Sequence, residues 1–85
     1  MPHHKSAEKR VRTNEKSRQR NIALRSRMRS ALKAVRTATS RSQAETAYRH
    51  AVAVLDRTVA KGVIPRGTAD RHKSRLALFT STLPA

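Results

Sequence analysis

The cations near the N-terminus are the side chains of this sequence best suited to chemistry. Residues 5–21, KSAEKRVRTNEKSRQRN, carry seven Lys and Arg side chains, and only Ala7 and Val11 offer apolar surface. Ammonium and guanidinium groups form charge-assisted hydrogen bonds to phosphate, and arginine adds a planar, bidentate fork. The chemistry that this segment indicates is therefore the binding of a polyanion.

Other kinds of reactive site find little support in the sequence. The chain has no cysteine, and so neither a thiolate ligand for zinc nor a cysteine nucleophile. His3 and His4 are adjacent and lack the i, i+4 spacing of a helical metal pair. We expect His50 to be exposed and His72 to lie at the edge of the core. The sequence thus predicts a protein that is not an enzyme, with no catalytic residue, metal, cofactor or small-molecule substrate.

The net charge of the whole chain indicates the same kind of partner. Twenty Lys and Arg against five Asp and Glu give +15 at pH 7 over 85 residues. Residues 1–36 hold 12 of the basic and 2 of the acidic residues, a net +10, which leaves +5 for residues 37–85. A domain this small needs a polyanion to offset such self-repulsion, and nucleic acid is the usual one.

Neither secretion nor membrane insertion is indicated. The longest apolar run, AVAVL at residues 51–55, is far too short to span a bilayer. The absence of cysteine agrees with a reducing compartment. We therefore expect an intracellular protein with no membrane partner.

The spacing of apolar residues predicts an all-α fold. No glycine or proline occurs between residues 3 and 61, and we predict helices over about 5–37, 43–61 and 66–81. Their apolar stripes are Leu24, Met28, Ala31, Val35 and Ala38; Ala44, Tyr48, Ala51, Leu55 and Val59; and Ala69, His72, Leu76, Phe79 and Leu83. Each stripe is too narrow to be buried alone, so residues 1–85 are predicted to form one three-helix bundle whose long N-terminal helix extends beyond it.

Two loops are predicted to separate these helices. The polar cluster at Thr37–Ser42 suits a turn, and Ser42 with Glu45 matches a capping box at the start of the second helix. Gly62 can close that helix in the left-handed conformation, and Pro65 suits the first position of the third.

Residues 5–21 cannot be held in place by packing alone. Ordering one residue costs about 1–2 kcal/mol of backbone entropy, whereas burying a valine returns about 1.5–3 kcal/mol. Like-charged pairs four residues apart, such as Lys5/Lys9 and Arg12/Lys16, add repulsion. We expect the segment to fray alone and to become ordered against phosphates, whose condensed counterions are then released.

The two halves of the first helix are predicted to present their charges differently. At about 100° per residue, the cations before Asn21 point in almost every direction. Those after it cluster roughly opposite the apolar stripe, with Arg27 as the exception; they are Arg25, Arg29, Lys33 and Arg36. A folded RNA can surround a projecting helix, which duplex DNA does with difficulty. RNA is the favoured partner, and an architectural role on nucleoid DNA remains the alternative.

Three segments carry a resemblance to a known family: HKSAEKRVRTNEKSRQRN at 4–21, SRMRSALK at 26–33 and KGVIPRGTADRHKSRLA at 61–77. In order and separation they resemble the S-twenty family of bacterial small-subunit ribosomal proteins, over nearly the whole chain. Glu8, Pro65, Gly67 and the C-terminal end ALFTSTLPA depart from the usual pattern of that family. These departures bear on the start of the third helix and on RNA contact by the last residues.

The resemblance implies a protein of the cytoplasmic ribosome that binds 16S ribosomal RNA directly in the small subunit. It further implies that the protein stabilises the folded 5′ domain and the 3′ minor-domain helix of that RNA, with few protein contacts and no cofactor. Carried over by position, the implied RNA contacts are Lys5, Ser6, Lys9, Arg10, Arg12, Asn14, Lys16, Arg18, Arg20, Asn21, Arg25, Arg29, Lys61, Arg71, Lys73, Ser74 and Arg75. Lys33 and Arg36 join this set through their position on the charged side of the first helix.

Overall fold

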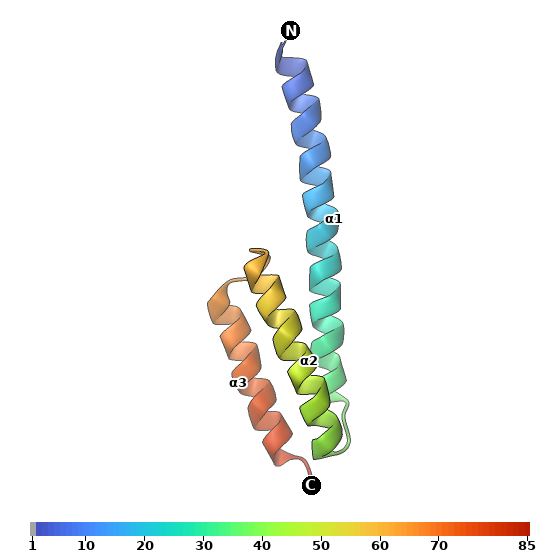
Figure 1. The fold of residues 1–85 in the computed structure, drawn as a ribbon, viewed down its shortest axis with the longest axis vertical. Coiled ribbons are helices and arrows are strands. Elements are labelled where there is room, and N and C mark those ends of the chain that lie inside the picture. The colour runs from blue at the N-terminus through green and yellow to red at the C-terminus, as the bar shows by residue number, and fades with distance from the viewer. Residues whose placement is uncertain (1) are drawn as a thin grey trace.

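The protein is an all-α bundle of three helices from which the first projects (Figure 1). The computed structural model describes residues 2–85, with side chains from Ser6 onward. The helices are α1 (Pro2–Arg36), α2 (Arg41–Ala60) and α3 (Arg66–Thr82), and residues 2–85 contain no strand. The predicted fold class is confirmed, and α1 begins three residues before the predicted start. No helix of this described part is long and apolar enough to cross a membrane.

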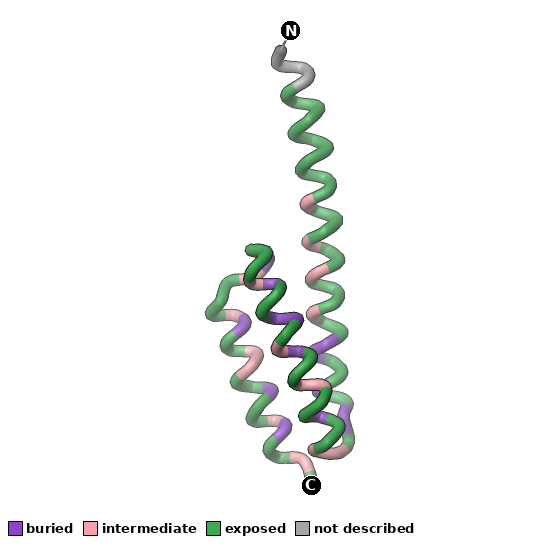
Figure 2. Tube along the Cα trace, in the orientation of Figure 1, coloured by how far each residue is buried: buried purple, intermediate pink, exposed green. Residues whose placement is uncertain are grey.

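Buried side chains are confined to the half of the molecule where the three helices run side by side (Figure 2). The core consists of Ala31, Leu32 and Val35 from α1, Ala51, Val54 and Leu55 from α2, and Ala69 and Leu76 from α3. Tyr48 and Phe79 pack against this core, as their spacing predicts. The principal axes of the molecule measure 67 × 20 × 13 Å because α1 continues far past the other two helices.

Helix α2 packs against both of its neighbours, which makes its buried face wider than the predicted stripe. Val54 and Thr58 are buried on α2 although neither belongs to that stripe, and Leu32 is the corresponding addition on α1. The Thr58 hydroxyl donates to the Val54 carbonyl at 2.7 Å, so this buried polar group is satisfied. A stripe predicted from one helix alone underestimates burial where two partners cover it.

The N-cap of α2 is Ser40, not the predicted Ser42. The Ser40 hydroxyl accepts from the backbone N–H of Gln43 at 3.3 Å. Beginning the helix at Arg41 lets the backbone N–H of that residue donate to the carbonyl of Pro84 at 3.0 Å. The Arg41 guanidinium also donates to the Ser81 carbonyl at 3.1 Å. These tertiary contacts to the C-terminal end of the chain favour the earlier cap, and a local pattern cannot reveal them.

The connection between α2 and α3 closes as predicted at Gly62, which has φ +73°. Its N–H donates to the Val59 carbonyl at 2.8 Å, and the next N–H, of Val63, donates to the Thr58 carbonyl at 3.1 Å. This pair of bonds is the Schellman motif, which satisfies the last carbonyls of a helix. Pro65 is the N-cap of α3 and not its first helical residue, a difference of one position from the prediction.

Candidate nucleic-acid interface

The projecting half of α1, residues 6–20, forms a helix without a packing partner. Every side chain in this segment is exposed except the half-buried Ser17, and Val11 retains 66% of its accessible surface (Figure 2). The helix has only local ties, such as the Thr13 hydroxyl donating to the Lys9 carbonyl at 2.8 Å. For residues 6–20 this agrees with the expectation that packing alone does not hold the segment in place, and its ordering by phosphates stays a prediction.

Arg18 is held by a neighbouring carboxylate. Its Nε and Nη2 donate to the two oxygens of Glu15 at 3.1 and 2.8 Å. These hydrogen bonds and the guanidinium charge lower the pKa of Glu15, and the carboxylate in turn raises the pKa of Arg18. Both groups lie at the surface, where water screens such a pair, so a phosphate can compete for the arginine.

The remaining described cations of this half form the N-terminal basic face, which consists of Lys9, Arg10, Arg12, Lys16 and Arg20. At about 100° per residue they fall within an arc of about 160°. Two open surface hollows share Lys9 and Thr13; Arg12 and Lys16 border one, and Arg10 borders the other. Arg18 lies outside this arc, about 160° from its middle, so the cations before Asn21 taken together still point in several directions, as predicted. Lys5 belongs to α1, but its side chain lies outside the described residues.

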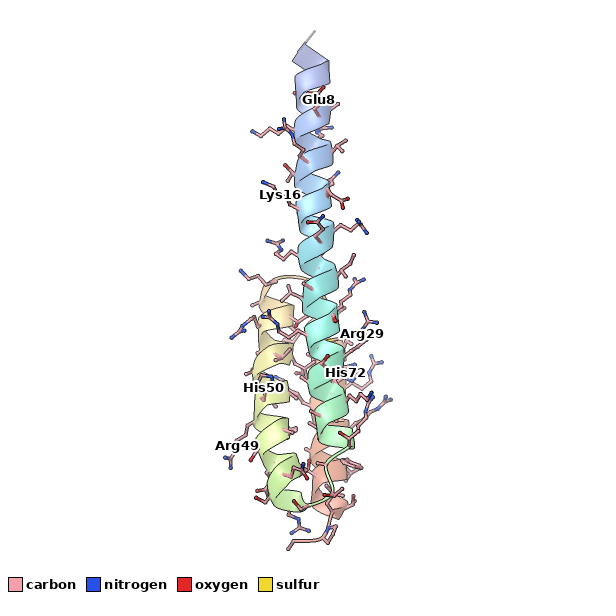
Figure 3. The ribbon with its side chains drawn as sticks, turned by 90° about the vertical axis from the view of Figure 1, so that its right-hand side faces the viewer. Glu8, Lys16, Arg29, Arg49, His50 and His72 are labelled. Atoms are coloured by element: carbon pink, nitrogen blue, oxygen red, sulfur yellow. The ribbon has the colours of Figure 1, made fainter. Side chains whose placement is uncertain are left out.

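Farther along α1 the cations change sides. The bundle basic face consists of Arg25, Arg29, Lys33 and Arg36, all of which are exposed. Helical geometry places the middle of this face opposite the middle of the N-terminal basic face. Figure 3 shows the change, because Lys16 and Arg29 point to opposite sides of α1. The predicted clustering of these cations on the side of α1 away from the core is confirmed.

Helix α3 adds cations to the bundle basic face. His72 is half-buried, and burial, followed by the charges of Arg36, Arg75 and Arg71, lowers the pKa of its imidazole. Charges from α1 and α3 therefore act on one histidine, so Arg36, Arg71 and Arg75 all lie near His72. The prediction that His72 lies at the edge of the core is confirmed, and His50 is exposed as predicted.

The seam between α2 and α3 is electrically balanced by comparison. Its two hollows are bordered by Arg41, Arg66 and Lys73 and by an equal number of carboxylates, Glu45, Asp56 and Asp70. These are all the acidic residues of α2 and α3. Lys73 forms an ion pair with Asp56 across the seam. The described cations outside this seam therefore include those of α1, Arg49 and Arg57 on the exposed side of α2, and Arg71 and Arg75 on α3. No cluster of metal-ligating side chains occurs in this described part.

Comparison with known proteins identifies the family. The family model described as ribosomal protein S20 matches residues 2–80. The chain belongs to this family. Similar proteins include the small ribosomal subunit protein bS20 of Nitrosomonas eutropha, 49% identical over 84% of this chain and 85% of that protein. The bS20 proteins of Saccharophagus degradans and Shouchella clausii are 47% and 45% identical, with the full length of both chains covered.

The structure distributes the residues predicted for this S20 family member over several surfaces. Ser6 and Asn14 border the same hollow as Lys9 and Arg10, and so extend the N-terminal basic face. Asn21 is half-buried between the two faces. Lys61 and Ser74 are exposed, but no described contact connects them with either face. The ion pair with Asp56 directs Lys73 toward α2, away from the bundle basic face.

Arg27 is a candidate contact that the predicted set for this family member omits. Its angular position on α1 matches that of Lys9, Lys16 and Arg20, and its side chain is exposed. These four residues recur at intervals of seven, four and seven, which is the spacing of a single helix face. The sequence already indicates this position, because Arg27 is the exception among the cations that follow Asn21 in the first helix.

Proposed function

We propose that this chain is a structural constituent of the small ribosomal subunit that binds 16S ribosomal RNA directly. Membership of the ribosomal protein S20 family supports this role, and the relatives named above are small ribosomal subunit proteins. The observation that carries the proposal is the pair of basic faces on opposite sides of α1, one of them on a segment with no packing partner. The protein would act in the cytoplasm as part of the ribosome.

Two opposed faces suit two separate RNA segments. Phosphates beside Lys9, Lys16 and Arg20 would lie on one side of the projecting half of α1. Phosphates beside Arg25, Arg29 and Arg75 would lie on the other side, at the level of the bundle. In the proposed complex, one face contacts the 5′ domain of the RNA and the other contacts the 3′ minor-domain helix, so that α1 holds the two together.

Recognition in this proposal depends on RNA shape and phosphate position. Modules that read single-stranded bases use exposed aromatic platforms. The only aromatic residues of the chain, Tyr48 and Phe79, are half-buried and pack against the core. Arginine forks and exposed serines can instead contact phosphates and 2′-hydroxyl groups along a folded RNA.

The experiment is a salt titration of binding to two separate 16S fragments, one for each domain. Variants that replace Lys9, Lys16 and Arg20 by alanine, or Arg25, Arg29 and Lys33 by alanine, are each expected to weaken binding to one fragment much more than to the other. A charge-matched control replaces Arg49, Arg57 and Arg66, which lie on α2 and at the seam between α2 and α3. Equal losses in all three variants would show that binding follows net charge alone.

The same titration separates the RNA role from the alternative on DNA. Each lost phosphate contact lowers the slope of log K against log salt by about 0.7–0.9. We therefore expect Arg25→Ala with Arg29→Ala to lower it by about one to two. Duplex DNA of matched length should compete weakly. Competition as strong as that of the RNA fragments would favour an architectural DNA-binding protein.

A further inference from the structure

On α1, one large exposed apolar side chain, Ile22, lies among the cations of the bundle basic face and retains 50% of its accessible surface. We propose that Ile22 packs against ribose surface of the RNA bound at this face and supplies a part of the affinity that does not depend on salt. This inference rests on the proposed RNA-binding function and adds a contact of a different physical kind. It names a residue outside the set predicted from charge and resemblance.

The position of Ile22 on α1 places it among the cations of the bundle basic face. Ile22 precedes Arg25 by one helical turn and Arg29 by two, and its direction from the helix axis falls between those of Arg29 and Lys33. The apolar side chains that pack on the core are on the other side of α1, beginning with Met28, and Ile22 is not among them. The exposed surface of Ile22 therefore faces whatever the arginines bind.

Val11 shows that exposure alone does not define such a contact. It retains 66% of its surface and lies three helical turns before Ile22, so both side chains point in nearly the same direction. Its neighbours on that side include the carboxylates of Glu8 and Glu15, three residues before it and four after it, with Arg12 at the same hollow and Arg18 paired with Glu15. The two carboxylates make this surface less positive than the surface around Ile22, so Val11 is a control for exposure without a purely cationic setting.

The surrounding charge selects RNA as the occupant. A second copy of the chain would bring the cations around Ile22 against the same cations of its neighbour, which repel. A sugar–phosphate strand instead places phosphates on the flanking guanidinium groups and the carbon face of a ribose over the residue between them. The wide, shallow minor groove of an RNA helix exposes such sugars to side chains.

The test compares Ile22→Ser with Val11→Ser in the full chain, using the 16S fragment that requires Arg25 and Arg29, at low, physiological and high salt. We expect Ile22→Ser to weaken binding about five- to tenfold at every salt concentration with an unchanged slope, as loss of part of an isoleucine contact would do. Ile22→Leu and Val11→Ser should stay within about twofold of the wild type. Circular dichroism checks that the three variants keep their helix content.

Several outcomes would overturn the inference alone: no loss of affinity in Ile22→Ser, equal losses in Ile22→Ser and Val11→Ser, or a changed salt slope. A change in self-association of Ile22→Ser on sedimentation, without a change in RNA affinity, would identify a second copy as the occupant and reject RNA. If the wild type itself bound the fragment without steep salt dependence, the proposed function would fail as well. The salt dependence of wild-type binding therefore distinguishes failure of the Ile22 inference from failure of the proposed function.

Discussion

The two ends of α1 have the same backbone conformation but different reasons for it. Near its C-terminal end, Ala31, Leu32 and Val35 are at most 4% exposed and pack against α2 and α3. Near its N-terminal end the helix has the Glu15–Arg18 ion pair, a few local hydrogen bonds and a basic face. Burial therefore stabilises one end within the chain, whereas the other end is held by phosphates in the proposed complex. The buried residues that stabilise the fold are therefore distinct from the exposed cations that are proposed to bind RNA.

Deleting residues 1–20 should affect binding most strongly and folding little. The deletion removes the whole N-terminal basic face, so we expect the affinity for 16S RNA at physiological salt to fall by about a thousandfold. The bundle keeps all of its buried residues and should remain helical. Filter binding and circular dichroism measure the two effects, and loss of α2 and α3 would show that the projecting half contributes to folding.

Leu55→Ala tests the other end of the comparison. Leu55 is fully buried at the centre of the core, and truncation to alanine should lower the free energy of unfolding by about 2–5 kcal/mol. Urea denaturation measures this change. The matched substitution Val11→Ala removes exposed surface from the projecting half and should change stability by less than about 0.5 kcal/mol. Similar losses in both would contradict the division of the molecule into a packed bundle and an unpacked projecting half of α1.

Gly62→Ala tests the connection that keeps α2 and α3 antiparallel. Gly62 has φ +73°, so a Cβ there is strained although the surrounding space is open. We expect a loss of about 1–2 kcal/mol in the free energy of unfolding. Gly67→Ala is the control because Gly67 lies in α3 with open space around its Cα, and alanine there should add about 0.5–1 kcal/mol. Equal signs for the two changes would contradict the Schellman closure.

A smaller effect is expected from His72. Burial and the nearby arginines lower the pKa of His72 in the folded protein, whereas in the unfolded chain it takes up a proton near about pH 6.5. Between these two pKa values the unfolded state binds more protons, so stability rises with pH across that window. We expect urea denaturation to show lower stability at about pH 5.5 than at pH 7, and His72→Gln to reduce this difference. His50→Gln should leave it unchanged, since His50 is exposed.

Local sequence signals predict most of this fold. The absence of glycine and proline between residues 3 and 61 and the spacing of apolar residues are sufficient to predict three helices and the buried side of α1 to which Val35 belongs. These local signals fail where a segment far away in the sequence determines the position of a helix end. The local pattern predicts Ser42 as the cap of α2, whereas the contacts of Arg41 with Ser81 and Pro84 favour Ser40.

The candidate site is predicted less completely, because contacts between residues far apart in the sequence also determine it. Charge density indicates a polyanion partner, and helical spacing identifies the bundle basic face. Only the folded arrangement shows that Lys73 pairs with Asp56, seventeen residues away, and that Arg36 of α1 lies near His72 of α3. The sharing of one side of α1 by Arg27 and Lys9 is visible in the sequence once the angular positions are compared over the whole helix.

Amide hydrogen exchange of the full chain, free and bound to 16S RNA, tests whether the projecting half of α1 depends on phosphates. We predict rapid exchange at residues 6–20 in the free protein and strong protection in the complex. The amides of residues 51–55 should be protected in both states because they belong to the packed core. Strong protection of residues 6–20 without RNA, or none with it, would contradict the dependence of this helix on a bound polyanion.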